Sequence, residues 1–161
     1  MISIGEKLPS TEVTLVTGDT SQTITTGELF AGKRAVMFGV PGAFTPVCSG
    51  SHLPGFVILA DKIKAEGIDL IACLSVNDAF VMRAWAAQQN AEEIAMLADV
   101  NAQFTKAMGV GHDRPDLGGV RCQRFSMIVD DGTVTLFNLE KPRAFEVSDA
   151  ETILQALGSE R

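Results

Sequence analysis

The chain has 161 residues, of which 46% are hydrophobic and 20% charged, and a formal net charge of −7 at pH 7. This composition is that of an ordinary globular domain and excludes a disordered chain, while the negative charge argues against binding to nucleic acid or to an anionic membrane. No apolar run reaches the roughly 18 residues that a membrane span needs, and the first residues lack the basic region and long apolar run of a secretory signal. We therefore expect a single domain over residues 1–161, located in the cytoplasm.

The first half of the chain predicts a strand–helix–strand unit. Residues 12–17 come first and predict an edge strand. The apolar runs 35–40 and 70–76 do not alternate polar with apolar residues, so each predicts a central strand that is buried on both faces. The segment 48–66 between them is long enough for a crossover helix, which makes the two central strands parallel neighbours.

The second half predicts shorter elements, placed by their capping and turn residues. In chain order these are a helix over 79–89 that Asn77 or Asp78 caps, a short strand over 94–97, a helix that Asn101 caps and that ends before Gly109, and an exposed loop over 109–119.

The last part of the chain predicts a hairpin followed by a helix. Strands over 123–130 and 133–139 flank Asp131-Gly132, a dipeptide typical of a type I′ turn. Residues 148–151 form a Ser-x-x-Glu capping box that opens a helix through Leu157. Together the elements predict an α/β fold with a mixed sheet and helices on both faces, which is a thioredoxin-like architecture with insertions.

Three cysteines, at positions 48, 73 and 122, are an odd number and too widely spaced for a zinc site or a disulfide framework. We therefore expect no metal and no cofactor. Cys48 lies in the first turn of the expected crossover helix, where free backbone N–H groups and the positive end of the helix dipole favour an anionic thiolate. Thr45 precedes it near the N-cap, so its hydroxyl is expected within reach of the sulfur.

Pro41, Thr45 and Cys48 match the pattern P-x-x-x-T-x-x-C. With the stretches PGAFTPVCSGSHLPGF, LSVNDAFV and RFSM in the same order, the chain resembles the peroxiredoxin family over nearly its whole length, and within it the type II or peroxiredoxin 5-like subfamily. The resemblance implies a thioredoxin-like fold with peroxiredoxin insertions. It also implies a thiol-dependent peroxidase that reduces hydrogen peroxide and alkyl hydroperoxides through the Cys48 thiolate, which becomes a sulfenic acid.

The resemblance implies catalytic roles for Cys48, Thr45, Arg124 and Pro41. Arg124 would supply the cation that the local segment lacks. Arg121 is the competing arginine; in one extended strand the two would face opposite sides, and the resemblance selects Arg124.

Two side chains near the expected site keep more than one interpretation. His52, one turn beyond Cys48, would orient the site loop or cap local carbonyls. Trp85 is expected in the core or at an interface, and His112 in an exposed position.

The sequence leaves more than one way to reduce the sulfenic acid to the thiolate. Some relatives use a cysteine near the C-terminus, and residues 145–148 contain none. Cys73 is expected to be buried in its strand, and Cys122 to lie on the side of Arg124 by strand parity. We therefore expect an external reductant, either glutathione with glutaredoxin or thioredoxin.

The resemblance also implies a homodimer, to which Phe44, Pro46 and Phe80 would contribute unless they line the pocket. A redox sensor with the same site remains a rival hypothesis. A thioredoxin-type reductase does not fit, because position 51 is serine and position 45 is threonine, so Cys48 has no C-x-x-C partner.

Overall fold

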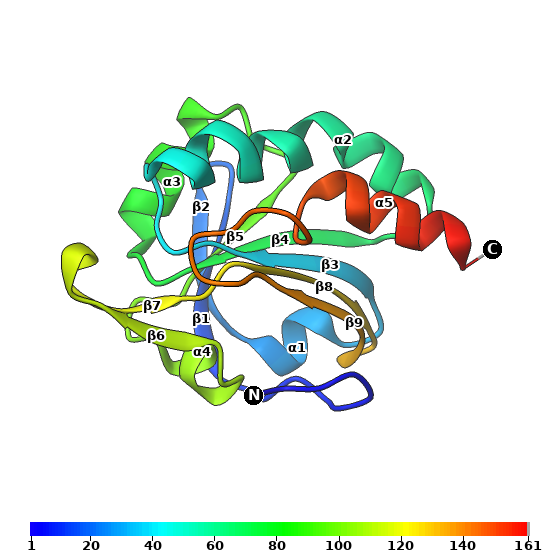
Figure 1. The fold of residues 1–161 in the computed structure, drawn as a ribbon, viewed down its shortest axis with the longest axis horizontal. Helices are drawn as coiled ribbons and strands as arrows, with labels where there is room; N and C mark the ends of the chain where they lie inside the picture. The colour runs from blue at the N-terminus through cyan, green and yellow to red at the C-terminus, as the bar shows by residue number, and fades with distance from the viewer. Residues whose placement is uncertain (161) are drawn as a thin grey trace.

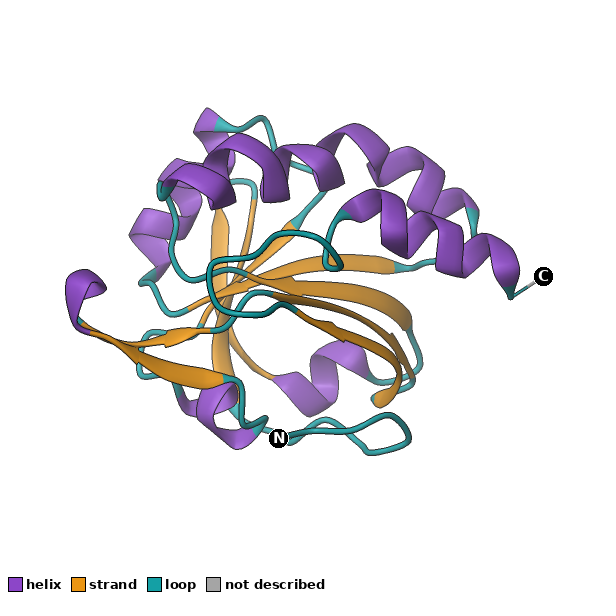
Figure 2. Cartoon of the chain, viewed as in Figure 1, coloured by secondary structure: helices purple, strands orange, loops and turns teal. Residues whose placement is uncertain are grey.

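The computed structural model describes residues 1–160, which form a mixed sheet of seven strands with helices on both faces (Figures 1 and 2). The strand order across the sheet is β2-β1-β5-β4-β3-β8-β9, and β6 and β7 make a separate hairpin. The elements in chain order are β1 (Glu12–Thr17), β2 (Thr20–Thr25), α1 (Thr26–Phe30), β3 (Arg34–Gly39), the π-helical turn η1 (Cys48–His52), α2 (Leu53–Ala65), β4 (Leu70–Ser75), α3 (Ala79–Gln88), β5 (Ala95–Ala98), α4 (Gln103–Ala107), β6 (Gly111–Arg114), the 3-10 turn η2 (Pro115–Leu117), β7 (Gly119–Cys122), β8 (Phe125–Asp130), β9 (Thr133–Leu139) and α5 (Ala150–Ser159).

The centre of the sheet confirms the expected strand–helix–strand unit. β3 pairs in parallel with β4, with Phe38 opposite Cys73, and pairs antiparallel with β8 on its other side. Alternate side chains of β3 enter different cores, since Phe38 packs with α2, α3 and α5, whereas Met37 packs with α1 and α4. Figure 1 shows these two helical layers on opposite sides of the sheet. This alternation explains why the strand is apolar at every position.

The β8–β9 hairpin and one of the expected helix caps also agree with the sequence. Asp131 and Gly132 have φ values of 47° and 80°, the left-handed pair that a type I′ turn requires, and β8 and β9 flank them. Asp78 caps α3 by accepting a hydrogen bond from the N–H of Val81.

Three expectations about the edges of the sheet and the helix starts were wrong. β1 is not an edge strand, because β2 covers one side of it and β5 the other. Asp99, rather than Asn101, accepts the first N–H groups of α4. Asp149, rather than Ser148, caps α5 through the N–H of Thr152.

The segment 109–119, expected as an exposed loop, contains β6 and η2 and ends at the first residue of β7. Its glycines make this possible, since Gly118 and Gly119 have φ values of 91° and 135°, which other residues rarely adopt. The β6–β7 hairpin projects from one end of the molecule (Figure 1). Within residues 1–160, the structure contains no helix with the length and apolar character of a membrane span.

Candidate active site

Cys48 lies where the sequence places it, in the first turn of the long helix after β3. Helical backbone begins at Pro46, and the N–H of Ser49 donates to the carbonyl of Thr45 at 2.9 Å. Cys48 then opens the single π turn that leads into α2. Its side chain is fully buried among the residues of the core that contacts α2.

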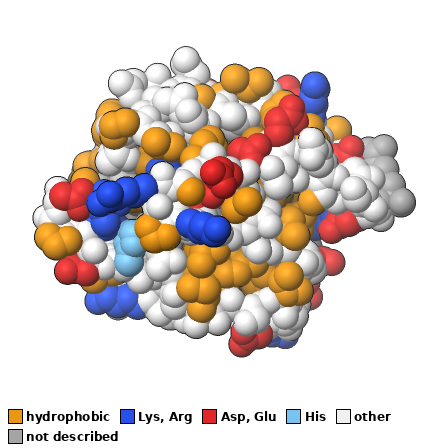
Figure 3. Space-filling view, in the orientation of Figure 1, with side chains coloured by type: hydrophobic (Ala, Val, Ile, Leu, Met, Phe, Trp, Pro, Cys, Tyr) orange, Lys and Arg blue, Asp and Glu red, His pale blue; other side chains and the backbone are white. Residues whose placement is uncertain are grey.

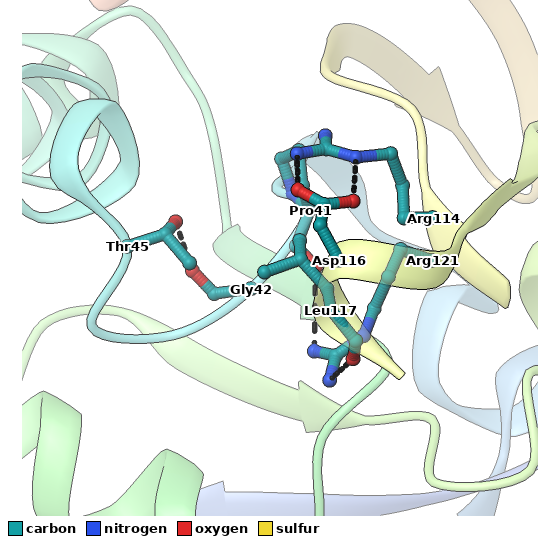
Figure 4. Close-up of polar contacts among 7 residues, drawn as sticks. All are labelled: Pro41, Gly42, Thr45, Arg114, Asp116, Leu117 and Arg121. Carbon is teal, nitrogen blue, oxygen red and sulfur yellow. Dashed lines mark hydrogen bonds and ion pairs between the residues drawn. The ribbon is translucent and has the colours of Figure 1, made fainter. Parts of the chain in front are cut away.

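The loop before Cys48 is held in a tight turn. The N–H and the hydroxyl of Thr45 both donate to the carbonyl of Gly42, at 3.4 and 2.7 Å (Figure 4). Phe44, inside this turn, has a φ of 65°, a backbone strain of the kind that collects at functional sites. The hydroxyl proton of Thr45 is therefore used in a hydrogen bond within the loop, and the lone pairs of the hydroxyl oxygen remain available to a proton of a ligand.

Arg121 ties this loop to the β6–β7 hairpin. Its guanidinium donates to the carbonyl of Pro41 at 3.4 Å and to that of Leu117 at 2.7 Å (Figure 4). A Cβ on Gly42 would lie 3.2 Å from the same guanidinium, so a glycine at this position lets the loop approach the arginine closely. Arg121 thus binds backbone, away from the cysteine.

Arg124 contacts the cysteine directly. One guanidinium nitrogen donates to the Cys48 sulfur at 3.0 Å, and another donates to Nδ1 of His52 at 2.9 Å. The ring of Phe145 lies 5.8 Å from the guanidinium carbon, within the range of a cation–π contact. A cation therefore faces the position where a thiolate carries its charge.

The strand argument that separated the two arginines was wrong, although the choice of Arg124 agrees with its contact to the sulfur. β7 ends at Cys122 and β8 begins at Phe125, so Arg121 and Arg124 do not share one extended strand. The expectation that Cys122 lies on the side of Arg124 rested on the same continuous strand and was also wrong. Its thiol packs in the core that contacts α1 and α4.

His52 is a buried, neutral hydrogen-bonding bridge. A guanidinium can only donate, so Nδ1 of His52 accepts from Arg124, and Nε2 donates to the carbonyl of Ser148 at 2.9 Å. Burial, and next the charge of Arg124, lower the pKa of His52 to about 3. The imidazole orients Arg124 and binds the carbonyl of Ser148 in the loop after β9. Of the two functions that the sequence left open it therefore caps a carbonyl, although a distant one rather than a local one.

Glu140 organises that loop. Its carboxylate accepts hydrogen bonds from the backbone N–H groups of Glu146, Val147 and Ser148 and from the Ser148 hydroxyl, at 2.7 to 3.0 Å. Burial raises the pKa of Glu140, but these hydrogen bonds outweigh it and hold the pKa below its ordinary value. A continuous chain of contacts thus runs from Glu140 through Ser148, His52 and Arg124 to the sulfur.

We expect Glu140→Gln to lower the free energy of unfolding by about 1–3 kcal/mol at neutral pH, because the amide brings donors toward backbone N–H groups that need an acceptor. Since folding lowers the pKa of Glu140, its contribution exists above the unfolded value of about 4.3 and disappears as the pH falls through the folded value. Denaturant unfolding of wild type and variant at about pH 7 and about pH 3 measures this difference. Equal differences at both pH values would contradict the assignment, and Glu146→Gln, an exposed side chain of the same loop, is the matched control.

Glu140 and Ser49 are the participants that the sequence did not indicate. Glu140 stands alone after a strand, with no motif that distinguishes it from a solvated carboxylate. Ser49 accepts a hydrogen bond at 3.0 Å from the indole N–H of Trp85, which is fully buried, as expected for a core residue. This bond fixes the turn after Cys48 to α3.

A pocket of about 390 Å³ opens beside the active-site loop and Arg124. Cys48 itself is fully buried and is not a lining residue, whereas Arg124, which contacts its sulfur, is one. The lining comes from the active-site loop, the β6–β7 hairpin, the link before β8 and the loop after β9: Pro41, Thr45, Pro46, Val47, His112, Arg114, Asp116, Leu117, Gln123, Arg124, Glu140, Lys141, Pro142, Arg143 and Ala144.

His112 is half-buried in this lining rather than exposed as expected, because the segment around it forms a hairpin instead of a loop. Its Nε2 is shielded from solvent and has no hydrogen-bond partner among residues 1–160.

The two other cysteines are buried free thiols. Burial raises the pKa of Cys73 well above its ordinary value, and the neighbouring Cys48 adds to this. Burial, and next the charge of Asp99, raise the pKa of Cys122. In the part of the chain that the structure describes, no group of three or more His, Cys, Asp or Glu side chains could hold a metal ion.

A thiol at a helix start, contacted by a guanidinium that lines a pocket, is the setting of a reactive cysteine, here on a mixed α/β sheet. The Redoxin family model matches residues 3–154. The chain is 47% identical to peroxiredoxin-2E, chloroplastic, of Arabidopsis thaliana, over 97% of this chain and 69% of that protein. It is 42% identical to peroxiredoxin-2D of the same plant, over 97% of this chain and 98% of that one.

Among solved structures, reduced Prx3 from Vibrio vulnificus in complex with hydrogen peroxide superposes with a TM-score of 0.94 at 56% identity, covering 98% of this chain and 99% of that one. Peroxiredoxin 5 from Alvinella pompejana superposes with a TM-score of 0.86 at 33% identity, covering 99% of each chain. The chain belongs to the peroxiredoxin family, with a thioredoxin-like fold, and is a thiol-dependent peroxidase.

Proposed function

We propose that Cys48 is the residue that attacks the peroxide. Its thiolate sulfur displaces one peroxide oxygen from the other, so the O–O bond breaks, an S–O bond forms and the sulfur is oxidised by two electrons to a sulfenic acid. The departing oxygen takes a proton and leaves as water, or as an alcohol from an alkyl hydroperoxide. The observation that carries this proposal is the Arg124 guanidinium, 3.0 Å from the sulfur, in the lining of the pocket.

The other residues of the motif position the reactants. Arg124 stabilises the thiolate and then the charge that develops on the peroxide oxygens. Thr45 offers the free lone pairs of its hydroxyl to a peroxide proton, since its own proton is donated to Gly42. Pro41 fixes the loop through its ring and through its carbonyl, which Arg121 binds.

An external thiol returns the sulfenic acid to the thiolate. Cys122 packs on the opposite side of the sheet from Cys48, and Cys73, buried in β4, keeps its proton because burial raises its pKa. Neither is therefore suited to attack the oxidised sulfur. We propose glutathione with glutaredoxin, or thioredoxin, as the reductant.

Treating the reduced protein with one equivalent of hydrogen peroxide is expected to modify Cys48 alone. Adding glutathione should then give a mixed disulfide at Cys48 and leave Cys73 and Cys122 as free thiols, because both are buried. Intact and peptide mass spectrometry after alkylation measures both states. A stoichiometric disulfide from Cys48 to either of the other cysteines would overturn the external route.

We further propose a homodimer that forms beside the active-site loop. Phe44 and Phe80 lie there with exposed fractions of 49% and 82%, a large apolar exposure for neighbouring segments, whereas Pro46, the third residue expected at the interface, lines the pocket. The N–H of Ala43 donates to Asn77, which brings the loop next to the start of α3. A cytoplasmic location fits this chemistry, because turnover needs a compartment in which thiols stay reduced.

A further inference from the structure

The outer wall of the active-site pocket carries a concentration of basic side chains. Arg114 comes from β6, and Lys141 and Arg143 come from the loop after β9. Figure 3 shows basic side chains near a histidine on this face, with hydrophobic side chains between them. Since the whole chain has a net charge of −7, this local excess of positive charge differs from the rest of the surface.

The basic side chains of the lining outnumber its two carboxylates, Asp116 and Glu140, although the charge of Arg143 also acts on Asp116. Asp116 binds Arg114 through two hydrogen bonds at 2.9 and 2.8 Å. Glu140 is engaged by the backbone of its own loop. Lys141 and Arg143 have no side-chain hydrogen bond or ion pair within residues 1–160, and both are exposed.

The pocket is also larger than a peroxide requires. About 390 Å³ lies within the range that holds small organic ligands. Its lining combines apolar side chains, among them Val47, Leu117 and Pro142, with these basic groups. Such a lining suits an organic molecule that carries carboxylates and further polar groups.

We propose that Lys141 and Arg143 form a carboxylate-binding site that holds the external reductant, a small peptide-like thiol such as glutathione, over Cys48. This inference rests on the proposed function. Once held, the thiol sulfur attacks the sulfenic acid, a mixed disulfide forms and the hydroxyl leaves as water. A second thiol then attacks the mixed disulfide, takes up the two oxidising equivalents as an external disulfide, and releases the Cys48 thiolate.

The test compares charged and uncharged thiols on a variant that lacks both cations. We use Lys141→Gln combined with Arg143→Asn, because Arg143 has a φ of 66° and asparagine tolerates that backbone. The rate constant for reduction of the Cys48 sulfenic acid is measured with glutathione and with dithiothreitol, which is uncharged. The rate constant with glutathione divided by that with dithiothreitol is expected to fall about tenfold in the variant. Added salt should lower the wild-type ratio and leave that of the variant nearly constant.

The control variant removes two exposed lysines that are not part of the pocket lining, Lys7→Gln with Lys62→Gln, and should keep the wild-type ratio. An unchanged ratio in the pocket variant overturns the reductant site. A second measurement compares oxidation of Cys48 by a carboxylated hydroperoxide and by tert-butyl hydroperoxide. If the pocket variant slows only the reaction with the carboxylated hydroperoxide and the thiol ratio stays constant, the two cations bind the peroxide substrate, and the reductant site is overturned. Absence of dithiothreitol-driven turnover in the wild-type protein would instead refute the proposed function itself, and the reductant site with it.

Discussion

Cys48→Ser is expected to reduce peroxide turnover to the background rate while the protein stays folded. Serine fills nearly the same volume in the fully buried position, but its hydroxyl does not ionise at neutral pH and is a far weaker nucleophile than a thiolate. Turnover with hydrogen peroxide and dithiothreitol measures the effect, and a thermal melt verifies the fold.

The matched control is Cys73→Ala combined with Cys122→Ala, which removes both other thiols. Because neither reaches the proposed reaction, this variant should keep most of its turnover. Substantial activity in Cys48→Ser, or its loss in the control alone, would refute the assignment of Cys48.

Arg124→Gln should slow the oxidation of Cys48 by about 10²- to 10³-fold, the usual cost of losing one preorganised donor to developing charge. The amide keeps some hydrogen-bonding capacity but removes the cation that lies 3.0 Å from the sulfur and leaves Nδ1 of His52 without its partner. Stopped-flow measurement of the reaction of the reduced enzyme with hydrogen peroxide gives the rate constant directly.

Arg121→Gln is the comparison that separates the two arginines. Its guanidinium binds the carbonyls of Pro41 and Leu117, so it supports the loop without contacting the sulfur. We expect a smaller loss than in Arg124→Gln. A larger loss in Arg121→Gln would show that the cation of the reaction had been misidentified.

Local signals were sufficient to predict the segment around Cys48. A buried strand, a proline-bounded turn and a helix start are adjacent in sequence, so the position of Cys48 follows from short-range preferences. β2 was missed because its sequence, TSQTIT, has little hydrophobic alternation. Its pairing with β1 stabilises it instead, which is a tertiary effect.

Longer-range contacts were beyond such reasoning. Arg124 was selected by resemblance alone, and the parity argument failed because two residues interrupt the strand between Cys122 and Phe125. The bridge from His52 to Ser148 joins residues 96 positions apart. No periodicity encodes such a contact, and only the assembled sheet brings its ends together.

The β6–β7 hairpin pairs with no strand of the seven-stranded sheet, yet it supplies His112, Arg114 and Leu117 to the pocket. The segments of the proposed chemistry and those that shape the entrance thus belong to different parts of the fold. Substitutions in the hairpin can diversify what the enzyme accepts while β3 and the helix start at Cys48 stay under packing constraint. Arg121 limits this freedom, because it joins the hairpin to the backbone of Pro41. We therefore expect substitutions in the hairpin to be tolerated better at other positions than at Arg121.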